Sequence, residues 1–186
     1  AHGDEPPPDA FCIGATMKKI LILLFSFATV AGCRSSVDIV ISRHVDPDGI
    51  KRIAIFKMDR LSYRENDKIS DLLIHEFLRL GYDVVERTEI EKLIKEQKLG
   101  VSGFVDPDQA VAIGKMAGAD SIVIGSGALE EKTRDELKYF TVKIIDLKTG
   151  SVVVTANLVK NLDIKTAISD LSASLKRSLE EHAKSR

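Results

Sequence analysis

Short apolar runs along the chain alternate with longer segments in which apolar residues recur at helical spacing. The run Ile50–Met58 is rich in β-branched residues and partly alternates with polar ones, which predicts a strand. Residues 82–86 and 120–129 predict two further strands. Residues 137–160 predict a hairpin, because the polar break Lys148-Thr149-Gly150 separates two apolar runs and ends in a glycine.

Helices are predicted between and after these strands. Apolar residues at helical spacing predict a helix over residues 66–80, which Gly81 ends. Thr88 and Glu91 have the spacing of a capping box and predict the start of a second helix. In a third helix Asp106 is the expected N-cap, with Pro107 in the first turn.

Gly114, inside that third helix, is expected to let the helix lie close to a sheet. The last helix carries its apolar residues as one stripe: Ile164, Ile168, Leu171, Leu175 and Leu179. Such a stripe covers a sheet, and its end at Leu175 and Leu179 is a candidate interface with a neighbouring subunit. Together the elements predict an α/β fold: a mixed β-sheet, with parallel crossovers and an antiparallel meander, flanked by helices.

The N-terminal region differs in character from this domain. Met17-Lys18-Lys19 precedes the apolar run Ile20–Ala31, which is too short to span a membrane and has the length of a signal peptide core. The following Val30-Ala31-Gly32-Cys33 resembles the lipobox of bacterial lipoproteins, which implies cleavage before Cys33 and lipidation of its thiol. A plain signal peptide with an incidental cysteine is the alternative.

These patterns divide the chain. We expect residues 1–16 to be an upstream extension or a cloning remnant, 17–32 a lipoprotein signal peptide, 33–48 a lipidated tether and 49–186 the α/β domain. Cys33 is the only cysteine of the expected mature chain, so no intramolecular disulfide can form there.

Charge narrows the choice of partners. Of the 27 Lys and Arg and the 28 Asp and Glu residues, two and three respectively precede Cys33, so the remaining chain has no net formal charge. A neutral surface of mixed charges argues against nucleic acid as the main partner.

One long segment carries a family resemblance. Val84–Ser126 resembles CsgG-type curli-secretion lipoproteins through a strand ending in Glu86-Arg87, a helix running into Glu96-Gln97, and Ala119-Asp120 before the next strand. The later DLKTGSVV matches the Asp-x-x-Thr-Gly hairpin of the same family. The resemblance covers about residues 51–160. It implies a periplasmic domain with an anticodon-binding-like fold, of the CsgG and TolB N-terminal type, tied by lipid to the outer membrane.

The chain departs from the channel-forming members of that family. Those members insert transmembrane hairpins, and each such strand needs about 9–11 alternating residues. The link at residues 130–136 and the turn at 148–150 leave no room for them, and the strands after Asp120 are all needed by the predicted sheet. The chain therefore resembles the short, non-channel relatives, which are accessory lipoproteins.

No catalytic, cofactor or metal site can be nominated. Lys148-Thr149-Gly150 matches a motif of penicillin-interacting enzymes, but no serine has a lysine three residues later. Asp46–Gly49 lacks the later ligands of a calcium loop and predicts a tight turn. The histidines show no metal-binding spacing. Glu86 and Arg87 are expected to form an ion pair at a strand-to-helix turn.

Two functions follow from the resemblance and the predicted anchor. The favoured one is a non-enzymatic lipoprotein on the periplasmic face of the outer membrane, which acts as a CsgG-like assembly or secretion accessory. Its partners would be an envelope protein complex or further copies of itself, with no small-molecule substrate. The alternative is an activator of a periplasmic enzyme such as a penicillin-binding protein.

Overall fold

The computed structural model describes residues 37–43, 45–46, 49–97, 106–133, 135–158 and 161–185. Cys33 and the expected signal peptide lie outside the described residues. The elements follow in this order: β1 (Val37–Ile41), β2 (Arg52–Ile55), α2 (Tyr63–Arg79), β3 (Asp83–Val84), α3 (Arg87–Glu96), α4 (Pro107–Met116), β4 (Ser121–Leu129), β5 (Glu136–Asp146), β6 (Val152–Leu158), β7 (Leu162–Asp163) and α5 (Ile164–Lys184).

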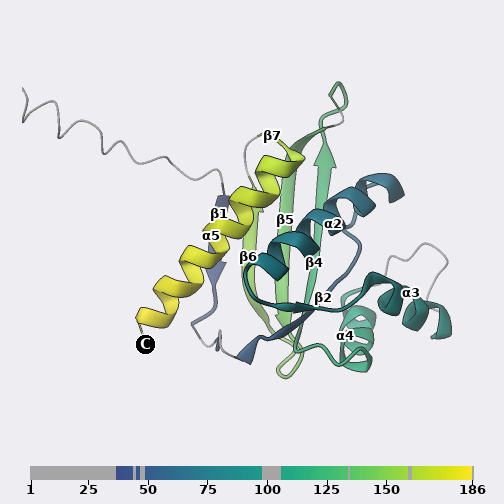
Figure 1. Ribbon diagram of the computed structural model, residues 1–186, viewed down its shortest axis with the longest axis vertical. Coiled ribbons are helices and arrows are strands. Elements are labelled where there is room, and N and C mark those ends of the chain that lie inside the picture. The colour runs from purple at the N-terminus through teal and green to yellow at the C-terminus, as the bar shows by residue number, and fades with distance from the viewer. Residues whose placement is uncertain are drawn as a thin grey trace, which may run out of the picture. The chain divides into compact units, whose positions relative to one another are not determined.

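The described strands form one sheet in the order β1-β6-β5-β4-β2-β3, and β7 pairs with β5 (Figure 1). Strand β2 pairs in parallel with β3 and β4, which follow it through helical connections. Strands β4, β5, β6 and β1 pair antiparallel in turn. The predicted mixed α/β sheet is confirmed, and its parallel part brings the carboxyl ends of β2 and β3 to the same edge.

Helices pack on both faces of the sheet. Along β2 and the residue after it, Ile53 and Ile55 belong to the core beneath α2 and α5, whereas Ala54 and Phe56 belong to the core beneath α3 and α4. The first core is the larger, and Figure 1 shows α2 and α5 crossing the same side of the sheet. Each fully buried aliphatic side chain stabilises the fold by about 1.5–3 kcal/mol.

The helix starts follow the sequence signals in one case and not in another. Asp106 and Gln109 form a reciprocal capping box with Pro107 at the first helical position of α4, as the sequence predicts. The box expected at Thr88 is wrong, because α3 begins at Arg87 with Glu86 as an N-cap that makes no side-chain bond. Helix α2 begins three residues earlier than expected.

Gly114 lies where α4 meets the sheet. A Cβ atom placed on it would lie 2.5 Å from Ile122 Cγ2 and 2.9 Å from Leu147 Cδ1, closer than side chains tolerate. The expectation that this glycine permits close helix–sheet packing is confirmed. The absence of a side chain at Gly114 lets α4 pack directly against β4.

Strand β1 corrects the expected tether over residues 33–48. Val37–Ile41 is the edge strand of the sheet, paired antiparallel with β6 from Val37 opposite Leu158 to Ile41 opposite Val154. Val37 is buried, and the partly buried Ile39 and Ile41 pack against the larger core. Their alternation suits an edge strand with one covered face, and a tether has no such partner. The folded domain therefore includes β1, which precedes the expected start at residue 49.

Candidate functional site

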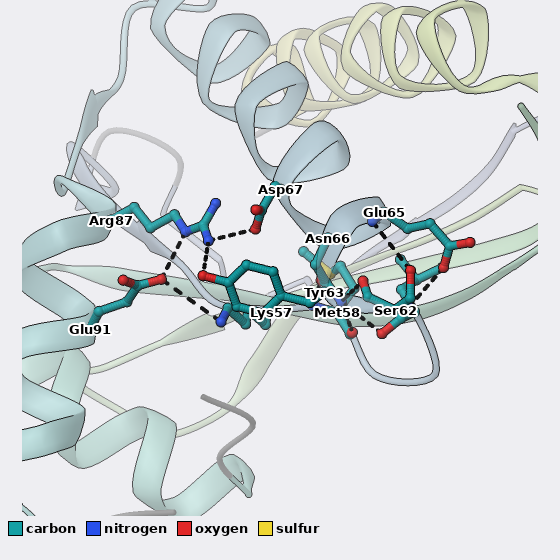
Figure 2. A network of polar contacts seen from close by, with 10 residues as sticks. Lys57, Met58, Ser62, Tyr63, Glu65, Asn66, Asp67, Arg87 and Glu91 are labelled. Carbon is teal, nitrogen blue, oxygen red and sulfur yellow. Dashed lines mark hydrogen bonds and ion pairs between the residues drawn. The ribbon is translucent and has the colours of Figure 1, made fainter. Parts of the chain in front are cut away.

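Five charged or aromatic side chains gather where the parallel strands β2 and β3 end. We call them the Arg87 network: Lys57, Tyr63, Asp67, Arg87 and Glu91. Figure 2 shows the Arg87 guanidinium between Asp67 of α2 and Glu91 of α3, with the Tyr63 ring alongside. The carboxyl ends of parallel strands are the usual place for sites in open α/β sheets.

Arg87 is the centre of this network. Its guanidinium pairs with the Asp67 carboxylate, and its Nε donates a hydrogen bond to Glu91 Oε1 at 3.1 Å. A further contact of 3.4 Å joins Arg87 Nη2 to the Tyr63 hydroxyl. The Arg87 side chain thereby joins α2 to α3.

Lys57 lies over the face of the Tyr63 ring. Its Nζ lies 4.1 Å from the Tyr63 ring centroid and 3.8 Å from Glu91 Oε1. A cation over an aromatic face stabilises by about 0.5–1 kcal/mol at exposed sites and more when desolvated. The Lys57 side chain is only 11% exposed, so the contact is largely shielded from water.

The acid–base state of Arg87 is fixed by its neighbours. Partial burial acts to lower its pKa, but the hydrogen bonds and charges of Asp67 and Glu91 together raise the pKa above the ordinary arginine value. The guanidinium is therefore permanently charged and cannot serve as an acid or a base.

The loop before α2 is held by Asn66, which is fully buried. Its Oδ1 accepts a hydrogen bond from the Met58 N–H at 2.6 Å, and its Nδ2 donates to Met58 O at 3.0 Å and Leu61 O at 3.1 Å. Ser62 and Glu65 complete a capping box at the helix start. This loop sets the position of Tyr63, the first residue of α2.

The Arg87 network suits protein contact better than catalysis. Its two cations and two carboxylates pair with one another, which leaves no free base or nucleophile among them. Tyr63 is nevertheless 58% exposed. The loop before it and the contacts with Lys57 and Arg87 hold it in place. A rigid, exposed aromatic residue is the kind of side chain that carries binding energy at protein interfaces.

A groove of about 560 Å³ lies at the opposite end of the strands. It is lined from the β1–β2 connection, the end of α4 and the β5–β6 turn, by residues that include Asp46, Lys115 and Lys148. Asp120 in its wall accepts hydrogen bonds from the backbone N–H groups of Lys51 and Arg52. That carboxylate is thus a structural acceptor.

The β5–β6 turn at this groove matches its sequence prediction. Asp146 accepts hydrogen bonds from the Lys148 N–H at 2.7 Å and from the Thr149 hydroxyl at 3.1 Å. Gly150 has a φ of 71°, which explains the glycine. The expected tight turn at Asp46 is also present, since the Gly49 N–H donates to Asp46 O.

The residues singled out from sequence are not brought together. Cys33 lies outside the described residues. Leu175 and Leu179, the candidate interface, are 2% and 9% exposed and belong to the larger core, because α5 lies flat on the sheet along its length. They have little apolar surface to offer a second subunit.

The ion pair expected between Glu86 and Arg87 is not the one that forms, because Arg87 turns to Asp67 and Glu91. The spacing of Arg87 and Glu91, four residues apart on a helix, could have indicated one of these pairs. Nothing in the sequence indicates Asp67, which is 20 residues away. Sequence reasoning missed the Arg87 network for this reason.

The part of the chain that the structure describes contains neither a metal-binding cluster nor a membrane-spanning helix. No cluster of three or more His, Cys, Asp or Glu side chains suited to a metal ion occurs in that part. None of its helices combines the length and apolar character needed to cross a membrane.

Comparison with known proteins gives a match to one family model. Residues 56–142 match the family model described as the curli production assembly/transport component CsgG. This stretch runs from the end of β2 into β5 and contains the whole Arg87 network. A comparison with curated protein sequences gave no match.

Solved structures of similar fold are distant. A PelC dodecamer from Paraburkholderia phytofirmans is 13% identical, with a TM-score of 0.47 over 74% of this chain and 91% of that one. The LpoB C-terminal domain from Salmonella enterica is 10% identical, with a TM-score of 0.44 over 61% of this chain and 82% of that one. TolB from Acinetobacter baumannii is 13% identical, with a TM-score of 0.45 over 77% of this chain and 31% of that one. Identities this low say nothing about what the chain binds.

Proposed function

We propose that the chain is a lipid-anchored accessory protein of bacterial envelope assembly or secretion, because residues 56–142 match the CsgG family model. It works by binding other proteins and has no catalytic activity of its own. Cys33 carries the lipid and holds the domain on the periplasmic face of the outer membrane. The family match is the observation that carries this proposal.

The anchor is supported by Val30-Ala31-Gly32-Cys33 after a short apolar run. Arg34 and Ser35, not Asp, follow the cysteine, which favours the outer membrane. Several acyl chains give durable anchoring, whereas a single chain gives only marginal, reversible binding. Cells expressing Cys33→Ala should incorporate no labelled palmitate into this protein and should release it from the membrane fraction. Retention of both label and membrane binding would refute the anchor.

The protein-binding role is supported by the Arg87 network, which presents Tyr63 rigidly within the family-matched residues. A photo-crosslinking phenylalanine analogue at Tyr63, introduced in cells, should form an adduct with a component of an envelope assembly or secretion complex. The matched control is the same analogue at Leu78, which is 54% exposed near the other end of α2.

Three results would weigh against this role in different ways. Equal adducts at both positions would mean that Tyr63 has no particular part in binding. The absence of any adduct from the lipidated protein would refute the contact. An adduct with a penicillin-binding protein would instead favour the activator function.

A further inference from the structure

Strand β1 begins four residues after the cysteine that the proposed function places at the membrane. An extended chain spans at most about 3.6 Å per residue, so Val37 can lie no more than about 14 Å from Cys33. A tether of fifteen residues would have allowed about 50 Å by the same rule. The fold therefore leaves little freedom between lipid and sheet.

The strand register shows which part of the domain extends past Val37. Val37 pairs with Leu158, and Leu158 pairs with Phe140 of β5. From Phe140, β5 extends four residues back to Glu136, about 14 Å at 3.4 Å per residue. In the other direction it extends six residues to Asp146, about 20 Å, and reaches the groove.

The chain enters β1 at the end of the sheet that carries the β4–β5 connection, residues 130–135. Figure 1 shows this connection and the start of α5 at the same end, with the β5–β6 turn at the other. The entry of the chain into β1 is therefore nearer to this end of the sheet, about 14 Å along β5, than to the β5–β6 turn, about 20 Å along β5.

We infer that the β4–β5 connection lies against the lipid surface, and that the groove and the β5–β6 turn point away from it. This orientation rests on the proposed lipidation of Cys33. It leaves Asp46, Lys115 and Lys148 on the side that a periplasmic partner approaches. The partner of the β4–β5 end is the membrane itself.

Charge does not produce this orientation. Residues 129–138 carry four acidic and three basic side chains, unlike the polybasic segments that bind anionic lipid. Asp135 of the connection is paired with Lys68 of α2 at 2.8 Å. Without its lipid the same end should show no affinity for a bilayer, so the short covalent link alone sets the geometry.

Site-directed fluorescence quenching tests the inference. Lys132→Cys places a reactive thiol in the β4–β5 connection, and Lys148→Cys places one in the β5–β6 turn; both lysines are exposed. Cys33, when lipidated, is a thioether and does not react with the fluorophore. The lipidated full chain is reconstituted in phosphatidylethanolamine–phosphatidylglycerol vesicles that contain a lipid with a nitroxide headgroup. The label at position 132 should be strongly quenched, whereas the label at position 148 should not be quenched.

A longer link is the matched control. Insertion of about 20 Gly and Ser residues between Ser36 and Val37 gives a mean span of about 25 Å and should remove the difference between the two positions. Equal quenching in the original lipidated chain overturns the orientation and leaves the anchor intact. Absence of palmitate from that chain overturns the proposed lipidation, and the orientation with it.

Discussion

Replacement of Asn66 by Ala should destabilise the protein more than any other exchange of one polar side chain in the Tyr63 region. Asn66 is completely buried and closes the loop between β2 and α2 through Met58, Leu61 and Ser62. Alanine has a higher helix propensity than asparagine, so the substitution does not weaken the helix itself. The effect therefore comes from the lost hydrogen bonds and not from the helix.

The magnitude follows from the partners left behind. The Ser62 carbonyl keeps its hydrogen bond from the Asn66 backbone N–H, at 2.9 Å. The Met58 N–H, the Met58 carbonyl and the Leu61 carbonyl lose the side-chain partner. Each buried polar group without a partner costs about 1–3 kcal/mol. Because the loop can open to water, we take the lower end for each, which gives about 3 kcal/mol in the free energy of unfolding.

Urea unfolding followed by circular dichroism measures this change. With a slope of about 2 kcal/mol per molar, the midpoint should fall by about 1.5 M. Asn157→Ala is the matched control: the same atoms are removed from a half-buried strand position, and the expected change is within about 0.5 kcal/mol. If the two variants unfold at the same urea concentration, Asn66 does not hold the loop and the reasoning is wrong.

Two further predictions follow from the packing and the caps. Leu171→Ala and Leu179→Ala should each lower the free energy of unfolding by about 2–5 kcal/mol in thermal melts, because both side chains lie in the larger core. If Leu179→Ala instead changes only the oligomer distribution in sedimentation, Leu179 contacts a second subunit and this prediction is wrong. Asp163 accepts a hydrogen bond from Thr166 that holds its pKa below 3.8, so its contribution to stability is present above that pH and is lost as the pH falls through the lowered pKa. The stability difference between the original chain and Asp163→Asn, measured by urea titrations from pH 7 to pH 2.5, should shrink at the acidic end, and a constant difference would contradict this.

The sequence by itself determined the elements whose signals are local. Asp106 followed by Pro107 specified the start of α4, because a side chain that accepts from the first-turn N–H groups acts within four residues. Gly81 and Gly150 ended their segments through positive φ angles of 93° and 71°. The apolar stripe of α5 specified its buried face. The mixed sheet followed from the order of these elements, since parallel strands require crossovers.

Only the tertiary structure decided the role of β1. Five residues from Val37 to Ile41 are too few to give a clear periodic signal, and an edge strand is stable only when its neighbour is in place. The pairing with β6 joins residues more than 110 positions apart. That pairing shortened the expected tether, and with it the distance between the domain and the membrane.

The Arg87 network was decided in the same way. Arg87 has an adjacent glutamate in the sequence, yet in the fold its guanidinium reaches Asp67 on one side and Glu91 on the other. Side-chain direction at the end of a strand depends on where the neighbouring helices pack, and that is set by the two cores. Leu179 follows the same rule, because the stripe predicts its face and only the length of sheet beneath α5 determines whether that face is covered.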